Sequence, residues 1–361
     1  MSTRVSTKKL KDAVNQAFNA AGKKPAIPIT EYLTIKVEDG KLNLVVTDGN
    51  AYTQVTIDAP KADDLLATVD IRKFSALVKR TTAEHITLSM VDDHLKVSGN
   101  GSYKLAQPVD EDKYVFEVEM PETPEPVVEG VINADDFTRA LVITRPAVAT
   151  DVTQPELVGF YLDKDRVAGT DSLQFSLTKV KGVDTPLLIP VEMVNAVMVM
   201  RDNIDYKVYP DSMVGFETPA IKIVGRQLEG IEDYPIEGMT AIYEKEFEGF
   251  CRVDRREMLD ALGRVNLFVE AYDMNAVTLT FGENQISLSS KDSAGSDTVA
   301  YQRTDKQKYI PFSCRIDVTS MIKLVTAQDG DTLHVSYGDE RVIRMDNGDT
   351  TQFLALVLED E

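Results

Sequence analysis

The chain repeats the same order of helices and hairpins about every 120 residues, and this repeat constrains its fold more than any other feature. Three segments that begin near residues 7, 134 and 254 carry apolar residues at the spacing of an amphipathic helix. A second set of helical segments follows at Ile71–Arg80, Val191–Arg201 and Val318–Thr326. Ser6 and Thr7 are the candidates to cap the first helix. Three repeats of this length predict three domains in tandem.

Alternating apolar and polar residues between the predicted helices indicate antiparallel β-hairpins. In the first repeat, Tyr32–Val37 and Leu42–Thr47 flank a turn at Asp39–Gly40. The linkers are polar, since Glu119–Glu129 holds three prolines among four glutamates and Ile231–Glu248 is acidic and predicted to be irregular. We therefore expect an α+β fold of three similar domains, each with two helices packed on antiparallel sheets, over residues 1–125, 128–243 and 246–361.

The sequence carries few of the residues and motifs that catalysis or metal binding requires. Its three histidines, His85, His94 and His334, are not spaced as metal ligands on one helix. It has no nucleophile elbow, phosphate-binding loop or dinucleotide fingerprint. Cys251 and Cys314 are too few for a disulfide framework and are expected to be free thiols. We expect neither enzymatic activity nor a cofactor or metal.

The beginning of the chain and its longest apolar run bear on location. Residues 1–11 lack the apolar stretch of a secretory signal. The longest apolar run, Val191–Met200, contains Glu192 and is shorter than the roughly 20 residues that span a bilayer. We expect a soluble cytoplasmic protein without a membrane partner.

Positive charge is concentrated in the first repeat of an acidic chain. The whole sequence has 39 basic and 59 acidic residues, a formal charge of −20, yet residues 4–24 hold six basic residues against one acidic residue. The basic residues on predicted helices form either ordinary solvated faces or a surface that follows nucleic-acid phosphates, and charge alone does not decide between them. The candidates for DNA contact are Lys8, Lys11, Lys24, Arg72, Lys73, Lys79 and Arg80 in the first repeat, with Arg139, Arg201, Arg256 and Arg264 in the later ones.

Several short motifs occur in a fixed order along nearly the whole chain. They are Lys24-Pro-Ala-Ile-Pro-Ile29, Thr47-Asp-Gly49, Val69-Asp-Ile-Arg-Lys-Phe74, Leu157-Val-Gly159, Thr170-Asp171, Leu188-Ile-Pro190, Glu229-Gly230 and Asp233-Tyr234. No single motif is specific, but their order and spacing closely resemble those of the bacterial DNA polymerase III beta subunit family, the sliding clamps.

The resemblance implies a ring-shaped processivity factor. In that family two chains close head to tail, and six similar domains turn their helices inward toward duplex DNA. This chain would then be half of a ring, with duplex DNA of any sequence, a DNA polymerase, a clamp loader and a second copy of itself as partners. By match to the family, Lys24 would touch DNA. The ring joint would pair Tyr103 and Leu105 of one copy with Phe268 and Val269 of the other.

The resemblance also implies a hydrophobic groove that receives partner peptides. Its matching residues are Leu157, Thr170, Ser172, Phe175, Leu356 and Leu358. The usual Thr-Asp-Gly-His-Arg-Leu motif is replaced by Thr170-Asp-Ser-Leu-Gln-Phe175, and the usual Phe-Pro-Asp-Tyr by Ile231-Glu-Asp-Tyr234. The groove stays apolar but loses its basic and proline features, so we expect a standard host peptide to bind poorly. A phage or plasmid origin would be consistent with this divergence. The alternative function is a diverged clamp-fold scaffold that binds proteins without encircling DNA.

Overall fold

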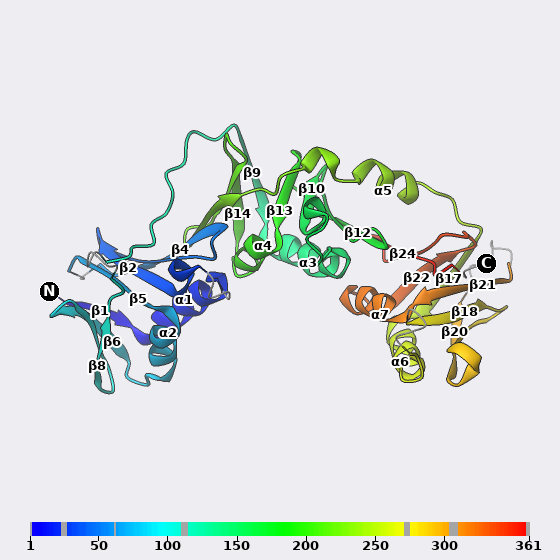
Figure 1. The fold of residues 1–361 in the computed structure, drawn as a ribbon, viewed down its shortest axis with the longest axis horizontal. Helices are drawn as coiled ribbons and strands as arrows, with labels where there is room; N and C mark the ends of the chain where they lie inside the picture. The colour runs from blue at the N-terminus through cyan, green and yellow to red at the C-terminus, as the bar shows by residue number, and fades with distance from the viewer. Residues whose placement is uncertain are drawn as a thin grey trace. The chain divides into compact units, whose positions relative to one another are not determined.

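The computed structural model describes residues 2–22, 27–60, 63–109, 115–270, 275–302 and 310–358. The chain forms two compact units (Figure 1). Unit 1 consists of Met1–Asp135 and Ile189–Gln227, and unit 2 of Asp136–Leu188 and Leu228–Glu361. Each unit therefore contains one complete repeat and part of the middle repeat.

The threefold repeat of the sequence is present in the order of the elements. Each repeat runs through one strand, a helix, four strands, a second helix and three strands. The first comprises β1 (Thr3–Ser6), α1 (Thr7–Ala20), β2 (Tyr32–Glu38), β3 (Lys41–Thr47), β4 (Ala51–Asp58), β5 (Leu65–Asp70), α2 (Ile71–Arg80), β6 (His85–Val91), β7 (His94–Ser98) and β8 (Ser102–Ala106). The second comprises β9 (Val128–Asn133), α3 (Ala134–Thr144), β10 (Gly159–Asp163), β11 (Arg166–Thr170), β12 (Gln174–Lys179), β13 (Leu187–Pro190), α4 (Val191–Val197), β14 (Asn203–Val208), β15 (Met213–Glu217) and β16 (Ile221–Arg226). The third comprises β17 (Gly249–Asp254), α6 (Arg255–Asn266), β18 (Ala276–Phe281), β19 (Gln285–Ser289), β20 (Ser296–Gln302), β21 (Phe312–Asp317), α7 (Val318–Ala327), β22 (Thr332–Tyr337), β23 (Val342–Asp346) and β24 (Thr350–Ala355). The predicted α+β class is confirmed.

Unit 1 contains two sheets, and the larger one joins the first two repeats. The four-stranded sheet has the order β1-β6-β7-β8, which leaves β8 at an edge. The eight-stranded sheet has the order β5-β2-β3-β4-β16-β15-β14-β9. Its central pair, β4 and β16, is antiparallel and in register from Ala51↔Gly225 to Val55↔Ile221. Backbone hydrogen bonds therefore carry the sheet from one repeat into the next.

Unit 2 contains a twelve-stranded sheet that joins the second and third repeats in the same way. Its order is β13-β10-β11-β12-β24-β23-β22-β17-β20-β19-β18-β21. The joining pair, β12 and β24, is antiparallel and in register from Gln174↔Leu354 to Thr178↔Thr350. Because the sheets run through the joints between repeats, the compact units do not follow the three proposed domains, whose boundaries stay a prediction.

The helices bury the apolar faces that their sequence spacing predicts. On α1 the side chains of Leu10, Val14 and Ala17 are fully buried, and on α2 those of Phe74 and Val78 are. These residues lie three or four positions apart, so they share one face of each helix. The opposite faces, which carry the basic residues, are left to solvent.

The side-chain cap expected at the start of α1 does not form. Ser6 occupies the N-cap position without a side-chain cap bond, and the Thr7 hydroxyl is buried with no hydrogen-bond partner among the described residues. Ser6 is also the last residue of β1 and pairs with His85, so the strand sets its backbone direction. In α2, by contrast, the Asp70 carboxylate accepts the backbone N–H of Lys73 at 2.9 Å.

Two predicted segments differ in the structure. The helix expected over Val191–Arg201 ends at Val197, where three-residue turns meet its last carbonyls: the N–H of Val199 donates to the carbonyl of Ala196 and that of Met200 to the carbonyl of Val197. The linker over Ile231–Glu248, expected to be irregular, contains the helix α5 (Ile236–Tyr243). Apolar residues at helical spacing in α5 were the missed signal.

The cysteine prediction is confirmed, because Cys251 and Cys314 are both free and buried. Burial raises the pKa of each thiol to about 12, so both stay protonated at neutral pH. Among the described residues, no helix is both long enough and apolar enough to cross a membrane.

Candidate functional site

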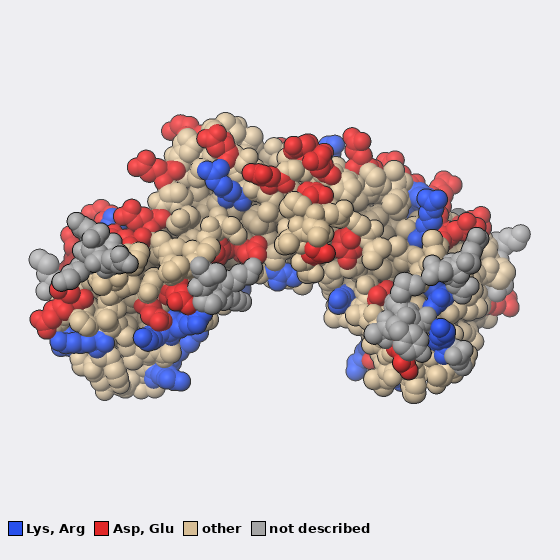
Figure 2. Space-filling view, viewed as in Figure 1, with Lys and Arg blue, Asp and Glu red and all other residues tan. Residues whose placement is uncertain are grey.

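The strongest candidate site is a basic face on the two helices of the first repeat. We define the basic face by its residues Lys8, Lys11, Arg72, Lys73, Lys79 and Arg80. Helices α1 and α2 pack against each other, and the Lys79 ammonium lies 4.7 Å from the centre of the Phe18 ring across their contact. Figure 2 shows Lys and Arg side chains gathered at the α1 and α2 end of unit 1.

The charges of the basic face are largely uncompensated by the chain itself. Arg72 lies 3.8 Å from Glu31, and the other five residues form no ion pair with any described residue. All six side chains are exposed except that of Lys11, which is half-buried. Six cations on neighbouring helices, five of them without a paired carboxylate among the described residues, provide the positive potential that attracts phosphate groups.

The basic residues predicted in the later repeats are less available. Arg139 on α3 lies 3.0 Å from Asp329 and 3.8 Å from Asp349. Arg264 on α6 donates to Asp297 at 2.6 Å, and this hydrogen bond holds the pKa of Asp297 below its usual range. These two arginines are held by carboxylates of unit 2.

The other three predicted DNA contacts have different environments. Arg201 is exposed and bonds backbone carbonyls at the end of α4, and Arg256 on α6 is exposed without an ion pair to any described residue. Lys24 lies outside the described residues. Uncompensated positive charge is therefore concentrated in unit 1.

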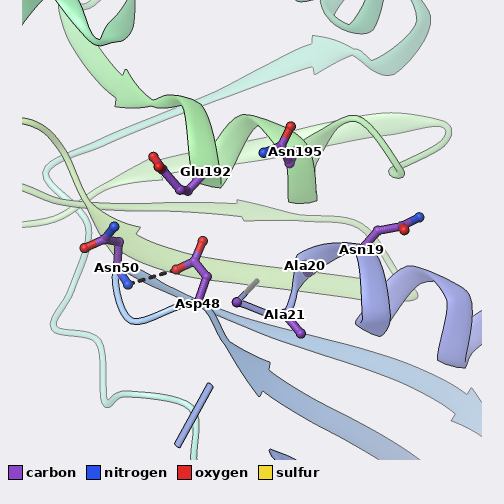
Figure 3. Close-up of a pocket in the computed structure, with 8 residues that line it drawn as sticks. Asn19, Ala20, Ala21, Asp48, Asn50, Glu192 and Asn195 are labelled. Carbon is purple, nitrogen blue, oxygen red and sulfur yellow. Dashed lines mark hydrogen bonds between the residues drawn. The ribbon is translucent and has the colours of Figure 1, made fainter. Parts of the chain in front are cut away.

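Unit 1 also contains a polar pocket that the sequence did not indicate. The pocket has a volume of about 240 Å³ and lies between the end of α1, the turn after β3 and the beginning of α4 (Figure 3). Two carboxylates, Asp48 and Glu192, line it together with asparagine amides. Asp48 accepts the backbone N–H groups of Asn50 and Ala51, each at 2.8 Å. The lining residues are far apart in sequence, so no local pattern predicts the pocket.

Burial raises the pKa of Asp48, and the negative charge of Glu192 raises it further. The backbone N–H groups of Ala51 and Asn50 lower the pKa of Asp48, but by less than burial raises it. A carboxyl group with a raised pKa in the folded state binds protons more tightly than in the unfolded chain, so its charge lowers stability at neutral pH. Asp48→Asn should therefore raise the melting temperature at pH 7 by about 1 to 3 °C. The difference should shrink as the pH falls through the raised pKa of Asp48, because the carboxyl group then loses its charge.

The equivalent turn in unit 2 provides a matched control for this change. Asp171 accepts the backbone N–H groups of Leu173 and Gln174 at 3.0 and 2.9 Å, but its second oxygen accepts the Gln174 side-chain amide at 2.8 Å. Asp171→Asn loses that acceptor and should lower the melting temperature at pH 7. A lower melting temperature for Asp48→Asn as well would contradict the electrostatic explanation.

The residues predicted for the peptide groove lie in two places of unit 2. Leu157 and Phe175 belong to an apolar cluster, in which Phe175 stacks on Phe353 with ring centres 4.3 Å apart. Both predicted residues are buried, with 3% and 6% of their surface exposed. The apolar cluster consists of Leu157, Tyr161, Ala168, Phe175, Leu177, Leu188, Tyr234, Met239 and Phe353.

Turn residues border the apolar cluster. The Thr170 hydroxyl is buried and donates to the carbonyl of Gln174 at 2.8 Å, while Ser172 is exposed with a φ of 76°. Such a positive φ is uncommon outside glycine, which occupies this position in the related motif. The hydroxyl of Thr170 also accepts the Ser172 N–H at 3.1 Å, which fixes the turn.

The C-terminal leucines lie beside β21, outside the apolar cluster. Leu356 forms a β-bridge with Ile316 and packs partly against the core of the third repeat. Leu358 is 68% exposed. Instead, Phe353 reaches the apolar cluster from the C-terminal strand. Sequence matching missed Phe353, which belongs to the apolar stretch Phe353-Leu-Ala355 at the end of β24.

The residues predicted for the ring joint lie at surfaces of the two units. Tyr103 and Leu105 are on the edge strand β8, and Tyr103 is 50% exposed. Phe268 follows α6 and is 54% exposed, whereas Val269 packs partly against the core of the third repeat. Nearby, β20 pairs with β17 only through its last two residues, Tyr301 and Gln302. Each unit therefore offers an apolar side chain beside an incompletely paired strand.

Comparison with known proteins supports one family. The family model for the N-terminal domain of the DNA polymerase III beta subunit matches residues 1–114. The beta sliding clamp of Streptomyces coelicolor is 23% identical over 328 residues, which cover 85% of this chain and 83% of that protein.

Solved structures agree with the sequence matches. The fold is similar to that of the DNA polymerase III beta subunit of Borrelia burgdorferi, with a TM-score of 0.86, 18% identity and full coverage of both chains. It is also similar to the Helicobacter pylori beta clamp bound to a DNA ligase peptide, with a TM-score of 0.80, 17% identity and coverage of 99% of this chain and 100% of that one. The similarity extends through all three repeats.

Proposed function

Because the chain belongs to the bacterial DNA polymerase III beta subunit family, we propose that it is a sliding clamp for DNA replication. Two copies close head to tail into a ring around duplex DNA of any sequence. The ring tethers a DNA polymerase, and a clamp loader places it on DNA. It acts in the cytoplasm, stays on DNA by topology and catalyses no reaction itself.

The basic face is the observation that carries this proposal. A chain with a formal charge of −20 repels DNA over most of its surface, yet six cations gather on α1 and α2. Contacts to phosphates alone are independent of sequence, which suits a protein that must move along DNA. A ring does not need strong contacts, because its closure prevents dissociation.

Neutralising the basic residues of α2 tests the DNA-facing role. Changing Arg72, Lys73, Lys79 and Arg80 to glutamine should weaken DNA association at low salt. Each lost phosphate contact reduces the slope of log affinity against log salt by about 0.9, so four contacts would reduce it by up to about 3.6. Fluorescence anisotropy with labelled duplex DNA measures this slope.

A control variant removes four positive charges from strands of unit 1 instead of from α2. Lys36, Lys41, Lys96 and Lys222 lie on β2, β3, β7 and β16, outside the two helices. Their replacement by glutamine should leave most of the salt slope unchanged. Equal losses for the two variants would mean that DNA responds to net charge and that the basic face has no special role.

The surfaces of the two units support head-to-tail closure. Tyr103 and Phe268 are half-exposed aromatic residues beside incompletely paired strands. Edge strands readily pair with another chain, and burial of apolar side chains stabilises such contacts. An interface between unlike surfaces of identical chains closes a ring when the rotation between copies is correct.

We further propose that partner peptides bind unit 2 at the predicted groove residues. The exposed Leu358 gives the cleanest test, because its side chain lies outside the core and can be changed without loss of folding. Leu358→Glu should weaken binding of the DNA ligase peptide about tenfold, or about 1.4 kcal/mol. Fluorescence anisotropy of the labelled peptide measures the affinity.

Val142→Glu is the matched control, since Val142 is 43% exposed on α3 and receives the same charge. It should bind the peptide like the unchanged protein. If Leu358→Glu also binds like the unchanged protein, the C-terminal leucines do not belong to the groove.

A further inference from the structure

Unit 1 contains another pocket, at the beginning of α1 beside the segment that joins α2 to β6. Its volume of about 400 Å³ lies within the range of roughly 300 to 1,000 Å³ that is typical of ligand pockets. We call it the α1 pocket. It is lined by the first turns of the helix, with Thr7, Lys8 and Lys11 among their residues, and by residues 81–84 of the joining segment. The pocket therefore shares Lys8 and Lys11 with the basic face.

The backbone at the beginning of α1 offers hydrogen-bond donors to the α1 pocket. An α-helix leaves the N–H groups of its first turn without a partner inside the helix. The N–H of Thr7 donates to the carbonyl of Glu84 at 3.0 Å, which holds the helix end against the joining segment. Ser6 forms no side-chain cap, and no side chain among the described residues accepts the N–H groups of Lys8 and Lys9. Such N–H groups carry partial positive charge and bind anions.

A buried hydroxyl in the same turn also lacks a partner. Thr7 lines the α1 pocket and is only 5% exposed, and its hydroxyl forms no hydrogen bond with any described residue. The large majority of buried side-chain hydroxyls in folded proteins are hydrogen-bonded, so each exception calls for an explanation. A hydroxyl of this kind at the wall of a pocket, beside the N–H groups of a helix end, points to a ligand that accepts hydrogen bonds.

The charged side chains at the pocket do not select the ligand by themselves. Lys8 and Lys11 line it together with the carboxylates of Asp12 and Glu84. Both carboxylates are exposed, and that of Glu84 lies 3.9 Å from His85, so they are in contact with water. The backbone N–H groups and the buried hydroxyl, in contrast, are donors with fixed positions. A phosphate group matches them, because it carries negative charge and its oxygens accept several hydrogen bonds.

From these donors we propose that the α1 pocket binds one phosphate group. The phosphate oxygens accept the N–H groups of Lys8 and Lys9 and the hydroxyl of Thr7, and the ammonium groups of Lys8 and Lys11 balance the charge. This inference goes beyond the sliding-clamp function, because one helix end holds a phosphate without a closed ring. A DNA backbone phosphate and a free phosphate ion share this chemistry, and the experiments below distinguish the two sources.

Amide NMR of the full chain with inorganic phosphate tests the α1 pocket directly. Phosphate is titrated at constant ionic strength, balanced with sodium chloride, so that general screening stays the same. The amide signals of Lys8 and Lys9 should shift and reach saturation in the millimolar range. Those of Arg72 and Arg80 on α2 should shift much less. Shifts without saturation, or equal shifts over the whole basic face, would overturn the proposal.

The hydroxyl of Thr7 gives the sharpest variant. Thr7→Val keeps the shape of the side chain and should weaken phosphate binding about tenfold. Its melting temperature without phosphate should stay the same or rise, because the change removes a buried hydroxyl that has no partner. Thr7→Ser keeps the hydroxyl and should bind phosphate like the unchanged protein. A lower melting temperature for Thr7→Val would mean that the hydroxyl serves the fold, and it would overturn the proposal.

Thr138→Val is the matched control for Thr7→Val. The Thr138 hydroxyl on α3 is also buried without a hydrogen-bond partner among the described residues, but Thr138 does not line the α1 pocket. Thr138→Val should therefore bind phosphate like the unchanged protein. Equal phosphate affinities for the two valine variants would contradict a role of the Thr7 hydroxyl in the site.

Two neighbouring lysines separate the pocket from the general charge of the helix end. Lys8 lines the α1 pocket, whereas the exposed side chain of Lys9 does not. Lys8→Gln should weaken phosphate binding at least fivefold, and Lys9→Gln should weaken it less than twofold, although each removes one charge. Equal losses would mean that phosphate responds to the charge of the helix end alone, which would overturn the proposal.

Duplex DNA identifies the source of the phosphate. Because the pocket shares Lys8 and Lys11 with the basic face, we expect Thr7→Val to weaken duplex association in fluorescence anisotropy and inorganic phosphate to compete with the duplex more than chloride does at equal ionic strength. Unchanged duplex affinity in Thr7→Val would assign the pocket to a free phosphate compound. Absence of saturable phosphate binding to the unchanged protein would overturn the pocket and leave the sliding-clamp function standing.

Discussion

Truncation of Phe268 and Val269 to alanine is expected to halve the mass in solution, from twice the 40.0 kDa of one chain to that of one chain. Phe268 is 54% exposed in the single chain, so a second copy in the proposed ring can bury a large part of its surface. Full burial of such a side chain contributes about 1.5 to 3 kcal/mol. A closed ring of two copies has two identical joints, so the pair of changes acts twice. Sedimentation equilibrium measures the mass.

The neighbouring Leu267 provides the control for this prediction. Leu267 is 81% exposed and lies outside the proposed joint, so Leu267→Ala should remain a dimer. The double variant should melt close to the unchanged protein, because each repeat keeps its own buried helices and strands. If the double variant stays dimeric, the joint is misplaced. If it unfolds, Phe268 and Val269 stabilise the core of the third repeat instead.

Individual helices and turns could be predicted from the sequence, because buried residues recur along a helix with the helical period. The apolar spacing predicted a helix starting near residue 7 and another over Ile71–Arg80, and the structure has α1 from Thr7 and α2 over Ile71–Arg80. The turn at Asp39–Gly40 was predicted from its residue types, and both residues have positive φ, at 52° and 72°. The residues that specify a helix or a turn lie within about ten consecutive positions. One sequence is therefore enough to recognise such an element.

Pairings between distant segments did not follow from the sequence. Nothing local in β4 or β16 identifies them as partners, since many alternating strands could satisfy the same hydrogen bonds. The short helix α5 was missed because the acidic residues around it resemble those of a linker. The role of its apolar residues is visible only in the folded chain, where Met239 packs into the apolar cluster.

The candidate sites also differ in how far they could be predicted, because some depend on neighbouring residues of one helix and others on contacts between distant segments. The basic face follows from helix periodicity, because residues opposite a buried stripe must be exposed. The ion pairs of Arg139 and Arg264 depend on carboxylates far along the chain, so counting charges overstated the availability of these arginines. The membership of the apolar cluster depends on which strand the sheet brings beside β12, and Phe353 of β24 belongs to that cluster together with Leu157.

Retention on DNA through ring closure is the second large effect that we expect. A clamp held by topology should survive a salt concentration that removes phosphate contacts, since each contact weakens steeply with salt. On a closed circular duplex its lifetime at about 0.5 M salt should exceed that on a linear duplex of the same sequence by more than tenfold. The Phe268 and Val269 double variant should be lost quickly from both, because it cannot close.

Linearisation of the DNA after loading is the most direct measurement of the central claim. The labelled protein is loaded onto a circular duplex with a bacterial clamp loader, transferred to high salt and then exposed to a restriction enzyme that cuts the circle once. We expect stable retention before the cut and rapid loss through the free ends after it. Equal retention on cut and uncut DNA would contradict topological binding, and failure to stay on either form would favour the scaffold that binds proteins without encircling DNA.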